Sequence, residues 1–79
     1  MNQSEIIANM ADIFDEVFEY EGALAADTTS DAVEEWDSLG HIRLVLAVES
    51  KFGVRFQPSE VVGLKNLGEL ADLVVQKLS

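Results

Sequence analysis

The chain has 79 residues and a formal net charge of −10, because fifteen Asp and Glu residues oppose only five Lys and Arg residues. So few cations argue against nucleic-acid binding, and the absence of cysteine excludes disulfides, thiolate metal sites and a protein thiol nucleophile. The sequence lacks both the apolar run of roughly 18 residues that a membrane span needs and the start of a secretory signal, so we expect one cytoplasmic domain over residues 1–79.

Residues 3–19 carry the apolar periodicity of an amphipathic helix. Apolar side chains recur at steps of four, three and one, which places them on one face, and acidic side chains fall mainly on the other. Asn2 or Ser4 is suited to cap its start. The apolar residues of this first helix are Ile6, Met10, Ile13, Phe14, Val17 and Phe18.

A long loop is expected over residues 20–37. This stretch contains Gly22 and a turn-forming cluster at 28–31, and it shows no sustained apolar period. A connection of this length inside a small domain usually has a functional reason. We expect Leu24, Val33 and Trp36 to anchor the loop on the core.

The second helix is predicted to begin at Asp37 and Ser38, whose side-chain oxygens can accept from the free N–H groups of its first turn, and to end before Gly53. Gly40 costs about 1 kcal/mol relative to Ala near a helix start, which indicates that something approaches the backbone there. The apolar residues surround much of this helix and predict that it is the central one, packed against more than one neighbour. They are Leu39, Ile42, Leu44, Val45, Leu46, Val48 and Phe52.

Two further helices complete the prediction. Pro58 suits the first position of a short third helix that ends before Gly63. Asn66 is expected to cap a fourth helix, with Glu69 three residues later in the spacing of a capping box. The fold class is therefore all-α, a small bundle of three main helices and one short helix, with the long loop between helices one and two. The apolar stripe of the fourth helix is Leu67, Leu70, Ala71, Val74, Val75 and Leu78.

Asp37-Ser38-Leu39 is the segment best placed to carry chemistry. A serine at a helix start is exposed and lies in the positive field of the helix N-terminus, where free N–H groups favour an attached phosphate diester. A serine that serves only as a helix cap has the same local pattern. These residues alone leave both interpretations open.

Catalysis and metal binding are both disfavoured. The ingredients of a hydrolase are present in Ser38, His41 and a carboxylate from Asp37 or Glu34. A domain of this size, however, buries only about 60% of the surface that its unfolded chain exposes, which leaves little room for an oxyanion hole and a water-excluding cleft. His41 is interpreted as an exposed helix residue or a partner contact. One histidine without cysteine excludes an ordinary zinc site, and residues 27–31 lack the spacing of an EF-hand. We expect neither enzyme activity nor a metal site.

The motif Glu-Trp-Asp-Ser-Leu-Gly-His at 35–41, followed by an apolar helix that ends in Lys-Phe-Gly-Val at 51–54, closely resembles the prosthetic-group segment of acyl and peptidyl carrier proteins. The likeness extends over the whole chain, from the acidic first helix to the short third one. It implies that Ser38 carries 4′-phosphopantetheine donated by coenzyme A, with Asp37 and Leu39 beside it. It also implies that acyl chains ride on this cofactor as thioesters.

The resemblance implies particular partners as well. They are a phosphopantetheinyl transferase, an acyl- or aminoacyl-loading ligase or transferase, and downstream synthases, and we expect the chain to act as a monomer. Residues 1–42 hold eleven of the fifteen acids and no Lys or Arg, whereas 43–79 hold all five bases. The acidic half is interpreted as a solvated surface that also steers the chain toward basic partners.

The second helix departs from the family pattern. Carriers of fatty-acid synthesis are usually rich in acids there, whereas this helix has Glu49 as its one acid after the serine. The departure favours a specialised fatty-acid-like, polyketide or nonribosomal-peptide pathway. An aminoacyl carrier of the peptidyl or D-alanyl type and an unmodified acidic interaction module remain as alternatives. The docking residues that we predict are Leu39, Arg43, Glu49, Val61 and Val62.

Overall fold

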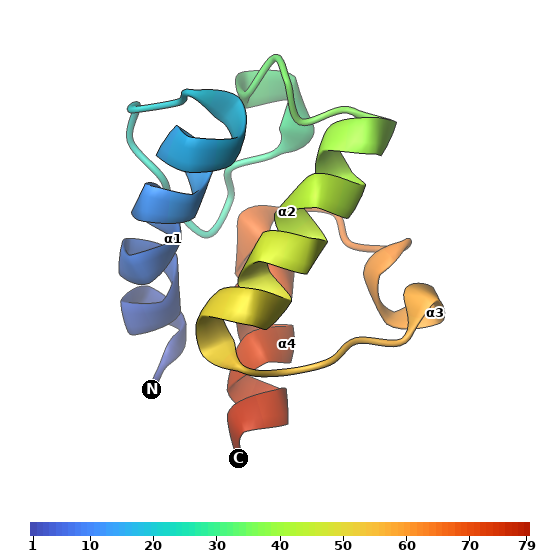
Figure 1. The fold of residues 1–79 in the computed structure, drawn as a ribbon. Helices are drawn as coiled ribbons and strands as arrows, with labels where there is room; N and C mark the ends of the chain where they lie inside the picture. Colours follow the sequence, from blue (N-terminus) through green and yellow to red (C-terminus); the bar gives the residue numbers. More distant parts are fainter.

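Four α-helices and one 3₁₀ turn make up the computed structural model, which describes all of residues 1–79 (Figure 1). The predicted all-α bundle of three long helices and one short helix is confirmed. No helix combines the length and apolarity needed to cross a bilayer. The elements are α1 (Gln3–Phe18), η1 (Ser30–Ala32), α2 (Ser38–Phe52), α3 (Pro58–Val61) and α4 (Leu67–Leu78).

Helix α1 is the central element of the bundle. It packs against both α2 and α4, which run back toward the end of the bundle where both termini lie, while the long loop crosses the opposite end (Figure 1). The prediction that α2 is the central helix is wrong. Three of its apolar residues, Leu39, Ile42 and Leu46, are 74%, 57% and 59% exposed, because only one face of α2 meets the bundle.

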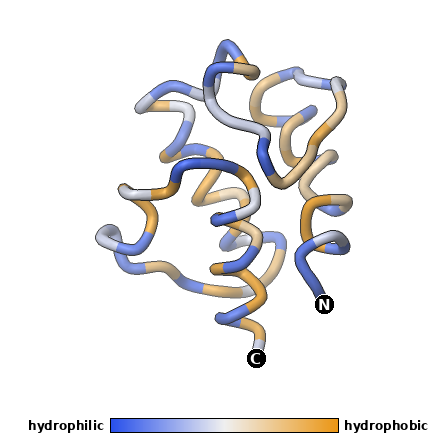
Figure 2. The backbone as a smooth tube through the Cα atoms, turned by 180° about the vertical axis from the view of Figure 1, so that it is seen from behind, coloured by the Kyte–Doolittle hydropathy of each residue, from blue (hydrophilic) through white to orange (hydrophobic).

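The core lies between α1, one face of α2, α4 and the end of the long loop. Phe14 is at its centre, with edge-to-face contacts to Phe18, Tyr20 and Trp36 at ring-centroid distances of 5.3, 6.2 and 5.5 Å. Val33 and Trp36 are buried and pin the loop as predicted, while Leu24 is half-buried against the core. Hydrophobic and hydrophilic stretches alternate along the long helices, as expected for elements with one buried face (Figure 2).

Side-chain caps fix the starts of the helices. Asn2 Oδ1 accepts from the Glu5 N–H at 2.9 Å, and Glu5 Oε1 accepts from the Asn2 N–H at 3.0 Å, which is a complete capping box. Asn66 caps α4 as predicted by accepting from the Glu69 N–H at 2.9 Å. The predicted capping box is wrong there, because the Glu69 carboxylate accepts from the N–H of Lys65 instead.

Gly40 is where the long loop meets α2. A Cβ atom at this position would overlap the Glu35 carbonyl oxygen and lie 2.9 Å from the Phe18 ring. The prediction that something approaches the backbone there is confirmed. The missing side chain lets the loop pass directly over the first turn of α2.

We predict that Gly40→Ala destabilises the chain by about 1–3 kcal/mol, although Ala alone is the better helix former. The reason is the overlap with the Glu35 carbonyl, which can be relieved only by moving the loop. Urea unfolding followed by circular dichroism measures the change. Gly63→Ala is the matched control, because no atom lies within 4 Å of a Cβ added there, and it should change the stability by less than about 0.5 kcal/mol. A Gly40→Ala chain as stable as the wild type would contradict the steric argument.

Candidate functional site

Asp37 sets the position at which α2 begins. Its side-chain Oδ1 accepts from the Gly40 N–H at 2.8 Å, and its backbone carbonyl accepts from the His41 N–H at 2.7 Å. These two bonds satisfy one free donor of the first turn and begin the helical ladder. The predicted helix start is confirmed, and Ser38 becomes the first residue of the helix.

Ser38 is exposed and has no internal partner. Its hydroxyl takes part in no hydrogen bond within the chain, and the N–H groups of Ser38 and Leu39 have no internal acceptor. Both N–H groups lie at the positive end of α2, where an anion is stabilised. Asp37 is the residue that caps α2, so the Ser38 hydroxyl is free to react. The interpretation of Ser38 as only a helix cap is therefore disfavoured.

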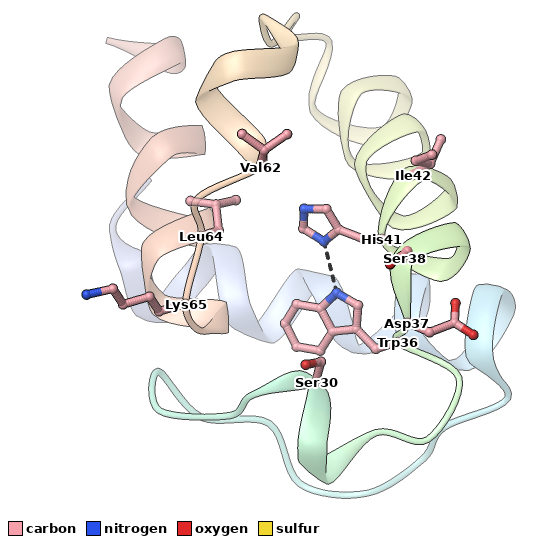
Figure 3. A pocket seen from close by; sticks show the side chains of 9 residues that line it. All are labelled: Ser30, Trp36, Asp37, Ser38, His41, Ile42, Val62, Leu64 and Lys65. Carbon is pink, nitrogen blue, oxygen red and sulfur yellow. Dashed lines mark hydrogen bonds between the residues drawn. The ribbon is translucent and has the colours of Figure 1, made fainter.

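An open hollow of about 560 Å³ lies beside Ser38, between the start of α2 and the segment that follows α3 (Figure 3). One part of its wall is apolar, from Ile42, Val62 and Leu64, and the rest is polar or aromatic. A flexible group attached to Ser38 would have this mixed surface within immediate reach. The full lining is Ser30, Trp36, Asp37, Ser38, His41, Ile42, Val62, Leu64 and Lys65.

His41 is not the exposed residue that we predicted. It is half-buried, its ring lies at 16° to that of Trp36 with the ring centroids 6.2 Å apart, and its Nδ1 accepts from the Trp36 indole N–H at 3.0 Å (Figure 3). Its Nε2 lies 2.8 Å from the carbonyl oxygen of Val61. Neither ring nitrogen is available to act as a base toward Ser38, so the arrangement lacks the activated serine of a hydrolase.

The tautomer of His41 follows from its two partners. An indole N–H can only donate and a carbonyl can only accept, so Nδ1 is the acceptor and Nε2 carries the proton. Sequence reasoning missed this role because Val61 lies twenty residues further along the chain.

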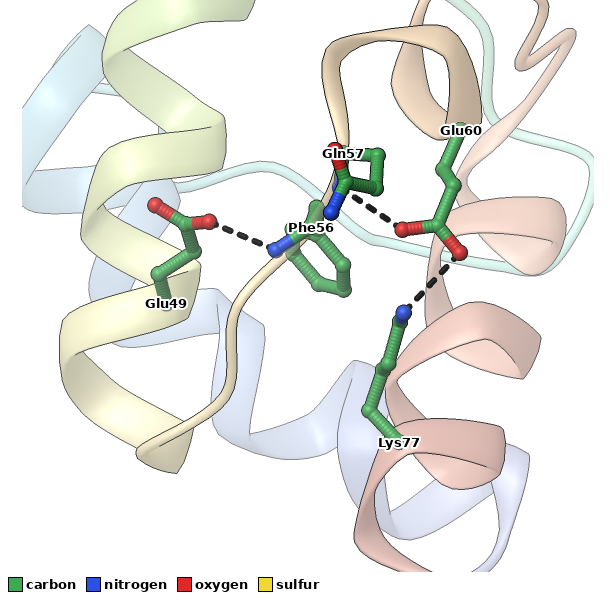
Figure 4. Close-up of polar contacts among 5 residues, drawn as sticks. All are labelled: Glu49, Phe56, Gln57, Glu60 and Lys77. Carbon is green, nitrogen blue, oxygen red and sulfur yellow. Dashed lines mark hydrogen bonds and ion pairs between the residues drawn. The ribbon is translucent and has the colours of Figure 1, made fainter.

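The predicted docking residues fall into two groups. Leu39, Arg43 and Val62 are exposed, with Leu39 at 74% and Val62 at 79%. Val61 is half-buried and offers its carbonyl to His41. Glu49 is also half-buried, and its Oε2 accepts from the Phe56 N–H at 2.8 Å, which ties the segment before α3 to α2 (Figure 4).

The exposed face of α2 includes Ile42 and Leu46, two of the apolar residues from which the sequence predicts packing against more than one neighbour. With Leu39 they follow the spacing i, i+3, i+7, which is one continuous stripe on a helix. The signal in the sequence is the number of apolar residues on α2, which exceeds what one packed face can bury.

Comparisons with known proteins agree with this geometry. The family model described as the phosphopantetheine attachment site matches residues 8–74. The chain is 34% identical to an acyl carrier protein of Acidothermus cellulolyticus, over 94% of this chain and 89% of that protein. It is 31% identical to a meromycolate extension acyl carrier protein of Mycolicibacterium aurum, over 98% of this chain and 79% of that protein. A solution structure of holo acyl carrier protein from Geobacter metallireducens superposes with a TM-score of 0.83 at 35% identity, covering 92% of this chain and 85% of that one.

We predict that Asp37→Ala costs about 1 kcal/mol of folding free energy, because the Gly40 N–H loses its acceptor and the start of α2 loses a favourable negative charge. Asp37→Asn keeps the accepting oxygen and should lose only a few tenths of that. Ser38→Ala should leave the stability within about 0.5 kcal/mol, since its hydroxyl bonds to nothing. Urea titrations of the three variants measure these differences. Equal losses in Asp37→Ala and Ser38→Ala would show that both residues share the capping role.

Proposed function

The chain belongs to the acyl carrier protein family, and on that premise we propose that Ser38 is the residue that carries 4′-phosphopantetheine. Members of this family are carriers and not enzymes, and the cofactor supplies a thiol on a long flexible arm, on which acyl groups travel as thioesters. The observation that supports Ser38 is its free hydroxyl at the N-terminus of α2, beside two N–H groups without an internal acceptor.

The residues around Ser38 fit a phosphate diester at this position. The unpaired N–H groups of Ser38 and Leu39 are donors for phosphate oxygens, and the dipole of α2 favours their negative charge. The Asp37 carboxylate is held by the Gly40 N–H. Because Asp37 and Gly40 hold the first turn in place, Ser38 is presented outward on a rigid support.

We further propose that the cargo is an acyl chain handled in a fatty-acid-like extension pathway. Relatives over nearly the full length of the chain are named acyl carrier proteins, and two of them, from Mycolicibacterium aurum and Mycolicibacterium smegmatis, are named for meromycolate extension. These names favour acyl cargo over aminoacyl cargo. The partners would be a phosphopantetheinyl transferase, an acyl-loading enzyme and the synthases that extend the chain.

For docking, we propose that partners contact the exposed part of α2 and the residue after α3. Leu39 and Val62 offer apolar contact, and Arg43 adds a cation among them. Glu49 and Val61 are less accessible than the other three predicted docking residues, because each forms an internal hydrogen bond. A partner that reads this surface would therefore sense apolar shape and a positive charge more than acidity.

Intact-protein mass spectrometry tests the attachment site. After incubation with coenzyme A and a broad-specificity phosphopantetheinyl transferase, the wild type should gain the mass of one phosphopantetheine and Ser38→Ala should gain none. Ser4→Ala, which removes an exposed serine from the first turn of α1, is the matched control and should be modified like the wild type. Modification of Ser38→Ala would place the site elsewhere. A wild type that stays unmodified beside a carrier that is modified would favour the unmodified interaction module.

The docking proposal is tested by charge reversal. Arg43→Glu should lower kcat/KM for loading by the chain's own partner enzyme by about five- to tenfold, because the reversed charge lies inside the contacted surface. Arg55→Glu reverses an exposed charge in the segment between α2 and α3 and should have a much smaller effect. Steady-state loading assays measure kcat/KM for both variants and for the wild type. Unchanged kinetics in Arg43→Glu would refute a role for α2 charge in docking.

A further inference from the structure

Helix α3 depends on side-chain ties for its position. It has four residues, none of them buried, and a helix this short has no stability of its own. Two ties are visible in Figure 4: Glu49 accepts from the Phe56 N–H just before α3, and Glu60 pairs with Lys77 of α4 at 2.9 Å. The Gln57 N–H and then the Lys77 ammonium hold the pKa of Glu60 below its ordinary value, because both stabilise its carboxylate.

The third tie is made by His41, and it differs from the other two in where it acts. Its Nε2–H donates to the carbonyl of Val61, the last residue of α3, which has no helical partner for that carbonyl. Its Nδ1 accepts from Trp36, two residues before Ser38. The imidazole thus joins the C-terminal end of α3 to the loop end that precedes Ser38.

Both hydrogen bonds of His41 satisfy groups that would otherwise lack a partner. The Trp36 indole N–H belongs to a buried side chain and can only donate, so it requires an acceptor nearby. No buried side-chain polar atom is left unpaired in the structure. Removal of the His41 ring would leave the Trp36 donor unpaired and the end of α3 untied.

The position of this tie relates it to the hollow beside Ser38. Trp36 lines the hollow on one side, Val62 and Leu64, one and three residues after Val61, line it on the other, and His41 lies between them (Figure 3). The His41 imidazole therefore joins the two walls, with one hydrogen bond to Trp36 and one to Val61.

We propose that His41 is a positioning residue, a neutral latch that holds α3 against α2 and so sets the width of the hollow next to Ser38. With the latch lost, the end of α3 moves away from Trp36 and the hollow widens. The bearing of this on an arm attached to Ser38 rests on the proposed function, whereas the latch itself does not.

The chain offers an unusually direct test, because it contains one tryptophan and one histidine. In the unmodified wild type, ¹⁵N NMR should show His41 as the neutral Nε2–H tautomer and a single slowly exchanging indole N–H. In His41→Phe, which keeps an aromatic ring but forms neither bond, we expect indole exchange to be about five- to tenfold faster. Amides of residues 61–64 should be exchange-broadened or exchange faster, and acrylamide should quench Trp36 more strongly.

Two further variants separate a latch from a general structural role. His41→Lys places a donor near the former Nε2 and has no side-chain acceptor, so it should restore the protection of residues 61–64 while indole exchange stays fast. Lys77→Gln removes the ion pair to Glu60 and should leave the Trp36 and His41 signals unchanged. If His41→Phe does not fold, His41→Lys still tests the proposal, because the two readouts must separate in it.

The proposal is overturned if the wild-type tautomer is Nδ1–H, or if both readouts move together in His41→Lys. It is also overturned if indole exchange in His41→Phe equals that of the wild type. Since all of these measurements use the unmodified chain, their outcome is independent of whether phosphopantetheine is added at Ser38. A chain that passes them but is not modified at Ser38 would retain the latch and lose the proposed function.

Discussion

Trp36 is buried against Phe14 with its ring perpendicular to the phenyl ring, and this contact fixes the end of the long loop where α2 begins. The loop spans residues 20–37 with only a three-residue 3₁₀ turn of its own, so its course depends on such anchors. With Trp36 in the core, the Glu35 carbonyl lies over Gly40 and Asp37 lies at the cap position of α2. The exposure of Ser38 is a consequence of where its neighbours are held.

Trp36 also connects the core to the hollow beside Ser38. The indole ring packs perpendicular to the Phe14 ring in the core, while its N–H donates to His41 at the edge of the hollow. A polar atom on a mostly buried aromatic ring needs a partner, and the partner here is a ring that also bonds to α3. Core packing and the geometry beside Ser38 are thus coupled through one hydrogen-bonded pair.

Local chemistry made most of the fold predictable from the sequence. The periodicity of α1, the caps at Asp37 and Asn66, the stop at Gly53 and the steric need for Gly40 are all short-range features, and each is confirmed. Periodicity does not reveal which apolar face finds a partner, and for that reason the sequence predicts a central position for α2, although Ile42 and Leu46 are exposed.

The role of His41 was unpredictable for a related reason. Its partners lie five residues earlier and twenty residues later, and only the packing of the loop, α2 and α3 brings them together. A half-buried histidine and an exposed one look alike in a sequence without a tertiary context. The geometry of the hollow could not be predicted from the sequence for the same reason, since its two walls come from segments that are distant in the chain.

A carrier domain of this size must combine a stable core with a reactive group that is free of it. In this chain the capping and packing near Ser38 are provided by other residues. Asp37 caps the first turn of α2, and Gly40 leaves room for the Glu35 carbonyl of the loop. The apolar stripe left exposed on α2 is costly in water, and it lies on a helix whose exposed charges include Arg43 and Lys51 in a chain of net charge −10. An uncovered apolar face of this kind is expected where a partner is to be met. Stability is therefore concentrated around α1, and the exposed surface of α2 is free for the docking that we propose.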